Sequence, residues 1–327
     1  MPEAARINPT SIQIAHSKTQ ACMSIRFSHF TNHSTMNTCP RHLRHVLHTM
    51  LIGLLLVSEV TAAPPEDQRQ VLRFAVEGRA DVSKIRLASD RRATVTVTAL
   101  SQSVAPNTSA APYKILAQNG RLPANITAVV QSLIVIPHEK RGRLKLRFET
   151  SDPAIRQSIT QAANFLMGFV SPKWLPRSEI RVQALPVSEN RAYATGLGKN
   201  ASIHLQPGVV NVETAIHELA HHIEGDHRFI LELSKRFIAR RARGGTPERL
   251  RDLTGHDYGA DEITLRANWT TRGGSHYVGK FYGSSLKQAT ATEVISMGLE
   301  RLYREPDTFF REDSDYFLFL LLALQSG

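Results

Sequence analysis

The feature that most constrains the fold is the segment TAIHELAHHIEGDH, in which His217, Glu218 and His221 form an H-E-x-x-H motif. The two histidines share a face only if the segment is an α-helix, because residues four apart in a helix lie one above the other. Two imidazoles at this spacing can bind one Zn²⁺, and Glu218 is then placed to take a proton from a water that the metal activates. The motif therefore predicts a helix, a zinc site and hydrolytic chemistry.

A zinc site of this kind needs a third protein ligand, and two residues qualify. His227 follows His217 by ten residues, the spacing of the longer H-E-x-x-H-x-x-G-x-x-H motif, but the glycine that this motif requires is displaced by one position. Glu293 would instead complete a His₂Glu set from a later helix. Glu293 also completes a capping box with Thr290, in which case it would only close the start of that helix. The residues alone leave these alternatives open.

The periodicity of apolar residues changes near residue 152. Before this point the sequence favours strands, at 71–78, 93–100, 133–139 and 143–150. After it, short strands are expected at 179–185 and 201–207, and helices at 153–169, from 211 onward, and at 228–243, 246–253, 291–304 and 314–325. We therefore expect an α+β fold, with a small β-rich accessory or pro-region over 63–151 and a mainly helical domain over 152–327.

The first 62 residues have the layout of a secretory signal peptide with a long extension before it. A basic flank with Arg41 and Arg44 precedes an apolar run and then small residues, and cleavage after Ala62 is expected. Cys22 and Cys39 would be removed with this segment, which would exclude a disulfide framework and a thiolate metal site. We expect a secreted or periplasmic protein.

The apolar run near the C-terminus and the net charge of the chain indicate which classes of partner to expect. The run YFLFLLLAL near the C-terminus is too short to cross a bilayer, so no stable membrane anchor is expected after cleavage. The net charge is +11, but no base-reading module accompanies it, so we expect no nucleic-acid partner. We expect one basic cluster to form the solvated face of a single helix; it consists of Lys235, Arg236, Arg240, Arg241 and Arg243.

From His217 to the C-terminus, the chain resembles the zincin-like, gluzincin-type metallopeptidases found in phage head-associated and bacterial secreted proteins. The resemblance covers about 110 residues and does not extend to the β-rich region. It rests on H-E-x-x-H-x-x-E at 217–224, Tyr-x-Gly-Lys-x-Tyr at 277–282, Thr-Glu-x-x-Ser-Met-Gly-x-Glu at 292–300 and an acidic, aromatic segment from 313. It implies a zincin-like catalytic domain in which His217, His221 and Glu293 bind zinc and Glu218 is the general base.

The expected function is therefore a zinc-dependent metallopeptidase that acts on a peptide or protein substrate. Two rivals remain: a catalytically silent scaffold that serves as a binding module, and a zinc hydrolase of a non-peptide amide. By analogy with zincins, the strand at 201–207 is expected to be the sheet edge along which a substrate lies. Three residues are candidates for oxyanion stabilisation: His276, Tyr277 and Tyr282. Glu224 is a candidate for orienting a ligand histidine.

Overall fold

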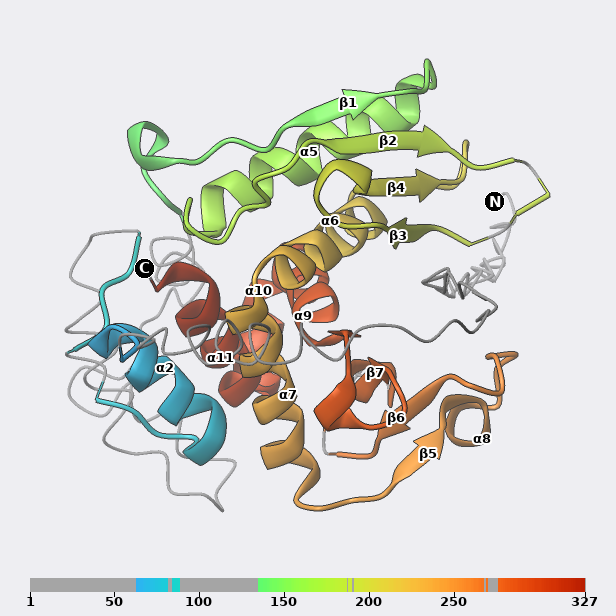
Figure 1. Cartoon of the computed structure of the whole chain (residues 1–327). Coiled ribbons are helices and arrows are strands. Elements are labelled where there is room, and N and C mark those ends of the chain that lie inside the picture. The colour runs from blue at the N-terminus through green and yellow to red at the C-terminus, as the bar shows by residue number, and fades with distance from the viewer. Residues whose placement is uncertain are drawn as a thin grey trace, which may run out of the picture.

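The computed structural model describes residues 63–81, 84–88, 135–186, 188–189, 191–267, 269 and 276–326 (Figure 1). The predicted signal peptide and its extension lie outside these residues, as does the predicted strand at 93–100. Helices and two small sheets make up the described chain, which confirms an α+β fold.

The larger sheet has four strands in the order β1-β2-β4-β3. Its strands are β1 (Leu146–Phe148), β2 (Ile180–Ala184), β4 (Ser202–Leu205) and β3 (Tyr193–Thr195). The first three run parallel, and β3 pairs antiparallel with β4. The strands predicted at 179–185 and 201–207 are confirmed. The prediction that 201–207 forms the sheet edge is wrong, because β3 lies against β4 and takes that position.

Two helices that pack against each other accompany this sheet: α5 (Pro153–Phe169) and α6 (Val212–Asp226). The side chain of Asp152 accepts a hydrogen bond from the backbone N–H of Ile155 at 2.8 Å, and Asn211 accepts one from Thr214 at 2.8 Å. Each cap satisfies an N–H group that has no partner within its helix. Both starts are therefore set by local sequence, as predicted, and α6 is buried from Ala215 to Glu224.

The smaller sheet is an antiparallel meander in the order β5-β6-β7-β8. Its strands are β5 (Pro247–Arg249), β6 (Ile263–Leu265), β7 (Lys280–Tyr282) and β8 (Ala291–Thr292). The predicted helix over 246–253 is wrong in its first half, because Pro247 pairs with Leu265 on β6 and only α8 (Leu250–Thr254) is helical. Pro247 is tolerated there because β5 is an edge strand.

The C-terminal half of the chain adds four helices: α7 (Arg228–Ala242), α9 (Val294–Arg304), α10 (Pro306–Glu312) and α11 (Ser314–Gln325). Nearly every residue of α11 is buried, which confirms a core helix at 314–325. Among the described helices, none is long and apolar enough to span a membrane. Figure 1 shows α6 and α9 between the two sheets, and these helices pack directly against each other.

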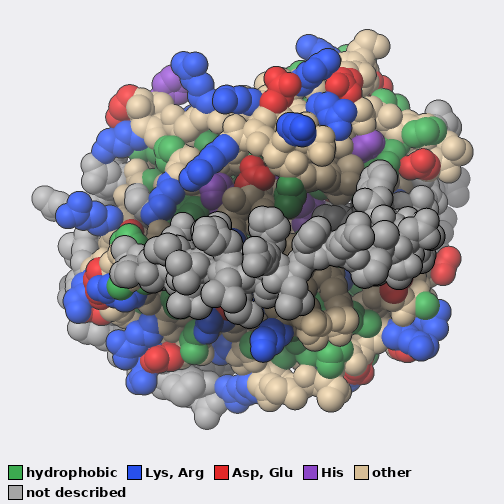
Figure 2. Space-filling view, viewed as in Figure 1, with side chains coloured by type: hydrophobic (Ala, Val, Ile, Leu, Met, Phe, Trp, Pro, Cys, Tyr) green, Lys and Arg blue, Asp and Glu red, His purple; other side chains and the backbone are tan. Residues whose placement is uncertain are grey.

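The basic cluster on α7 differs from the solvated face that was predicted. Arg240 pairs with Asp315 at 2.9 Å, and Arg241 pairs with Asp313 at 2.8 Å and with Asp315 at 3.0 Å. These ion pairs join α7 to the start of α11 and leave both arginine side chains mostly buried. Elsewhere, Figure 2 shows Lys and Arg side chains spread among acidic ones over the visible face.

The described residues of 63–151 contain fewer strands than predicted. Residues 71–78 do not form a strand; they belong to α2 (Glu66–Glu77), whose buried residues Val71, Phe74 and Ala75 recur at helical spacing. α2 packs against α7 and α11, and Gly78 ends it with φ 71°. The described part of 133–139 also contains no strand, because its end forms the 3₁₀ turn η4 (His138–Lys140). Only β1 is confirmed, and it pairs with β2 across the predicted boundary at residue 152.

Replacing Asn211 by Ala should lower the free energy of unfolding by about 1 kcal/mol, because the first turn of α6 loses its side-chain cap. Asn211→Ser should retain most of the stability, since a serine hydroxyl can accept the same hydrogen bond. Urea denaturation followed by circular dichroism measures both variants. Equal losses in the two would contradict a capping role.

Candidate metal centre

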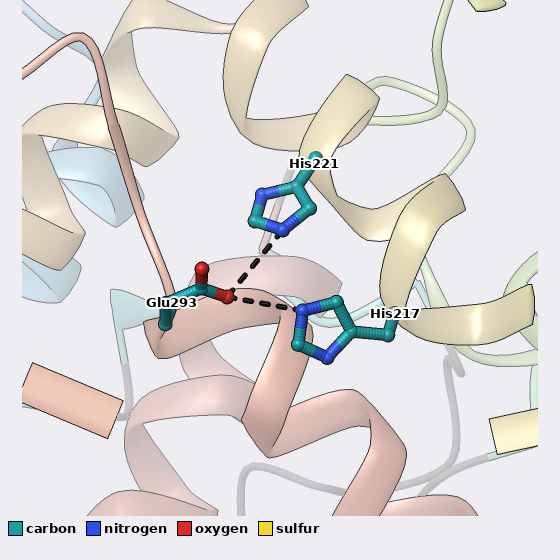
Figure 3. Close-up of side chains that lie close together, drawn as sticks. All are labelled: His217, His221 and Glu293. Atoms are coloured by element: carbon teal, nitrogen blue, oxygen red, sulfur yellow. Dashed lines mark hydrogen bonds and ion pairs between the residues drawn. The ribbon is translucent and has the colours of Figure 1, made fainter. Parts of the chain in front are cut away.

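The helix α6 places His217 and His221 on one face, as the motif predicts. Both side chains are buried, and their ring centroids lie 5.1 Å apart. Figure 3 shows both rings directed toward Glu293, which comes from a segment more than 70 residues later in the chain. The histidine nitrogens therefore converge on a carboxylate rather than on solvent.

Glu293 lies where a third ligand could complete the site. Its Oε2 lies 3.0 Å from Nε2 of His217 and 3.4 Å from Nε2 of His221, and it is fully buried. The three residues offer ligand atoms that lie within 4.8 Å of one another, so they could hold a metal ion. The capping-box interpretation is wrong, because α9 begins at Val294 and Glu293, at the N-cap position, makes no side-chain cap hydrogen bond.

His227, the rival third ligand, lies elsewhere. The helix α6 ends at Asp226, and His227 is the residue between α6 and α7. Its Nε2 lies 3.2 Å from the carbonyl oxygen of Leu175, and its ring packs edge-on against Trp174. Because the chain turns one residue before His227, this imidazole joins the core instead of the His217 group.

A second carboxylate orients His217. Oε2 of Glu300 lies 3.2 Å from Nδ1 of His217, opposite the nitrogen that faces Glu293. An outer carboxylate of this kind fixes the ring and its tautomer for metal binding. The sequence prediction gave Glu300 no role. The signal was present, since Glu300 follows Glu293 by two helical turns and so lies on the same face of α9.

The other oxygen of Glu293 is held by a polar chain from β7. The hydroxyl of Tyr282 donates to Oε1 of Glu293 at 2.5 Å, and Nζ of Lys280 lies 3.9 Å from the same oxygen. Lys280 also contacts the hydroxyl of Tyr277 at 3.3 Å. Both tyrosines, predicted as oxyanion candidates, are thus engaged in supporting a ligand. The third candidate, His276, lies in η6 (His276–Gly279), and its carbonyl accepts a hydrogen bond from Thr264.

Glu224 connects α6 to the segment that delivers Glu293. Its carboxylate accepts hydrogen bonds from the backbone N–H of Thr292 at 2.5 Å and from the hydroxyl of Thr292 at 2.7 Å. Burial raises the pKa of Glu224 to about 7, although the bonds from Thr292 lower it. Glu224 therefore positions Thr292, the residue next to Glu293. The hydrogen bonds of its carboxylate are made with Thr292, and not with His217 or His221 as the prediction required.

Glu218 is the one carboxylate of this group without a partner. It is fully buried, and neither of its oxygens has a hydrogen-bond partner among the described residues. Its pKa is raised to about 8, chiefly by burial; the charges of Glu293 and Glu300 also raise it, while those of His217 and Arg191 lower it. A buried, unsatisfied carboxylate is costly for a fold, so its position beside the ligand group calls for a functional reason.

The ligands themselves are strongly coupled. Burial lowers the pKa of His217, but its hydrogen bonds with Glu293 and Glu300 outweigh burial and raise the pKa to about 10. Burial alone would raise the pKa of Glu293, yet the charge of His221 and the bonds from both histidines hold it well below its usual range. In the metal-free protein, a proton on His217 therefore supplies positive charge beside Glu293.

Comparisons with family models, with curated proteins and with solved structures find no match to this chain. The zincin-like relationship therefore stays a prediction. What the structure adds is geometric: residues predicted from two separate motifs lie together in one buried group.

Zinc affinity should fall in a graded order when the surrounding residues are replaced. Glu300→Gln should weaken binding by roughly 10- to 100-fold, the effect of losing an outer hydrogen-bond partner. Glu293→Gln should weaken it more, because a direct ligand is lost, and His227→Gln should leave it unchanged. Competition with a chromophoric chelator measures all three. A larger loss in His227→Gln than in Glu293→Gln would refute the assignment.

Zinc affinity should also rise with pH. Because the pKa of His217 is about 10 in the metal-free chain, this histidine carries a proton at neutral pH and must release it on binding. One released proton corresponds to about a tenfold gain in affinity per pH unit between about pH 6 and 8. Calorimetry in buffers of different ionisation enthalpy measures the proton count directly. Binding without proton release would contradict this description of His217.

Proposed function

We propose that this protein is a zinc-dependent metallopeptidase with a zincin-like catalytic domain. The observation that carries the proposal is the buried, unpartnered carboxylate of Glu218, one residue after the ligand His217. Two imidazoles and one carboxylate are a donor set that suits zinc, and three protein ligands are the number found at catalytic zinc sites. When bound, zinc would supply Lewis-acid polarisation of water and of the substrate carbonyl.

The chain's own residues would bind the metal ion and transfer the proton. Nε2 of His217, Nε2 of His221 and Oε2 of Glu293 would hold the ion. Glu218 would accept the proton of the attacking water and pass it to the leaving amine, the general acid–base role. The positive charge of a bound metal favours the ionised form of Glu218, which offsets the effect of burial on its pKa.

A peptide substrate fits the geometry of the larger sheet. Among the described strands, β3 pairs only with β4, and α6 packs close to it. An extended peptide can add to such an edge through backbone hydrogen bonds, which favours peptides over other amides. We therefore assign the substrate strand to the edge of β3, in place of the strand at 201–207.

Two features of the site disfavour a catalytically silent scaffold. A structural zinc site is closed by four protein ligands, and the described residues bring three together here. A scaffold would also have no use for the uncompensated carboxylate of Glu218. The basic and apolar pattern at residues 41–63 supports secretion or a periplasmic location, which remains part of the proposal.

Glu218→Gln should retain zinc and lose hydrolysis by about 100- to 10,000-fold, because an amide cannot accept the proton. Zinc content by elemental analysis and cleavage of a fluorogenic peptide library measure the two properties. Glu213→Gln, in the first turn of the same helix, is the matched control and should change neither. Unchanged turnover in Glu218→Gln would remove Glu218 as the base.

A further inference from the structure

Arg191 lies beside the candidate metal centre and has no part in the ligand set. It precedes the edge strand β3 by two residues. Its Nη2 lies 2.9 Å from Oε1 of Glu262, which immediately precedes β6 of the smaller sheet. The ion pair therefore joins the substrate-facing edge of one sheet to the other sheet.

The same oxygen of Glu262 also contacts Nζ of Lys280, at 2.5 Å. The two cations differ in access: the Lys280 side chain is 1% exposed, whereas that of Arg191 is 20% exposed. Lys280 faces inward toward Tyr277 and Glu293. Arg191 is thus the more exposed cation of this pair.

The carboxylate of Glu262 is shared by two cations, Arg191 and Lys280. An anionic group of a substrate beside Arg191 would give this half-buried guanidinium a second carboxylate partner.

The guanidinium of Arg191 also has hydrogen-bonding capacity to spare. Nη2 binds Glu262, whereas the buried Nε has no hydrogen-bond partner among the described residues. Arginine presents five N–H donors in a planar fork that matches a carboxylate. Its free donors are therefore suited to a second carboxylate beside that of Glu262.

We infer that Arg191 determines substrate specificity by binding a carboxylate of a peptide that lies along β3. This rests on the proposed function. Because Arg191 precedes β3 by two residues, a peptide that pairs with the edge of β3 would run close to it. The carboxylate belongs to the peptide C-terminus or to an aspartate or glutamate side chain close to the scissile bond. The substrate class is then a peptide with an acidic group on the side of the scissile bond nearest Arg191.

The test measures binding, so that it does not depend on turnover. Full chain carrying Glu218→Gln is loaded with zinc, and fluorescence anisotropy follows the binding of three labelled peptide pools. The first pool is neutral with an amidated C-terminus, the second is neutral with a free C-terminus, and the third is amidated and contains glutamate. We expect about tenfold tighter binding of one acidic pool than of the neutral amidated pool, as for a charge-assisted hydrogen bond. The preferred pool identifies the source of the carboxylate.

Replacing Arg191 by Met should abolish this preference, and Arg191→Lys should keep part of it. Glu262 retains Lys280 as its partner in Arg191→Met, so no carboxylate is left unpaired. Arg266→Met is the matched control, because Arg266 forms an exposed ion pair with Glu248 on the same small sheet and should not alter the preference.

Two results would overturn the inference: equal binding of all three pools to the parent chain, or a preference that survives in Arg191→Met. Equal weakening of all pools in Arg191→Met would assign Arg191 a positioning role and would also overturn it. Hydrolysis by the chain with Glu218 intact is measured separately. Its absence would count against the proposed function, while the binding preference would still decide the role of Arg191.

Discussion

The structure depends on the packing of α6 against the segment that runs from β8 into α9. This contact brings His217 and His221 to Glu293, and it is fixed on one side by the bonds from Thr292 to Glu224 and on the other by the contact of Glu300 with His217. His217, Glu224 and Glu293 are each held by a partner on the opposite segment. The geometry of the candidate centre is therefore a property of the interface, and no single element forms it alone.

This interface carries a large electrostatic cost. Glu218, Glu224 and Glu293 are buried together, and burial acts to raise the pKa of each. Hydrogen bonds and nearby cations compensate Glu224 and Glu293, whereas Glu218 has no hydrogen-bond partner in the described chain. Apolar residues at these positions would favour the fold. The unpartnered carboxylate of Glu218, among the described residues, is the one that the proposed function uses as a proton acceptor.

The parts of this arrangement that follow from local sequence could be predicted, and those that follow from long-range contacts could not. The spacing of His217 and His221 predicted the helix that carries them, and its start near residue 211 was expected, but Glu293 was separated from His227 only by resemblance. Arg191, Lys280 and Glu300 were missed because their roles depend on sheet pairing and helix packing between distant segments. The errors at 71–78 and 246–253 have the same origin. Phe74 and Ala75 of α2 are buried against later helices, and Pro247, a common helix-start residue, pairs instead with β6.

The central claim is that His217, His221 and Glu293 bind one zinc ion. An anomalous difference map from crystals grown with zinc, recorded on both sides of the zinc absorption edge, tests it most directly. We expect one peak, at about 2.0 to 2.2 Å from Nε2 of His217, from Nε2 of His221 and from a carboxylate oxygen of Glu293. Two results would contradict this assignment. One is a zinc peak ligated by His227 in place of Glu293; the other is a fully occupied zinc at another position while His217 and Glu293 remain hydrogen-bonded to each other.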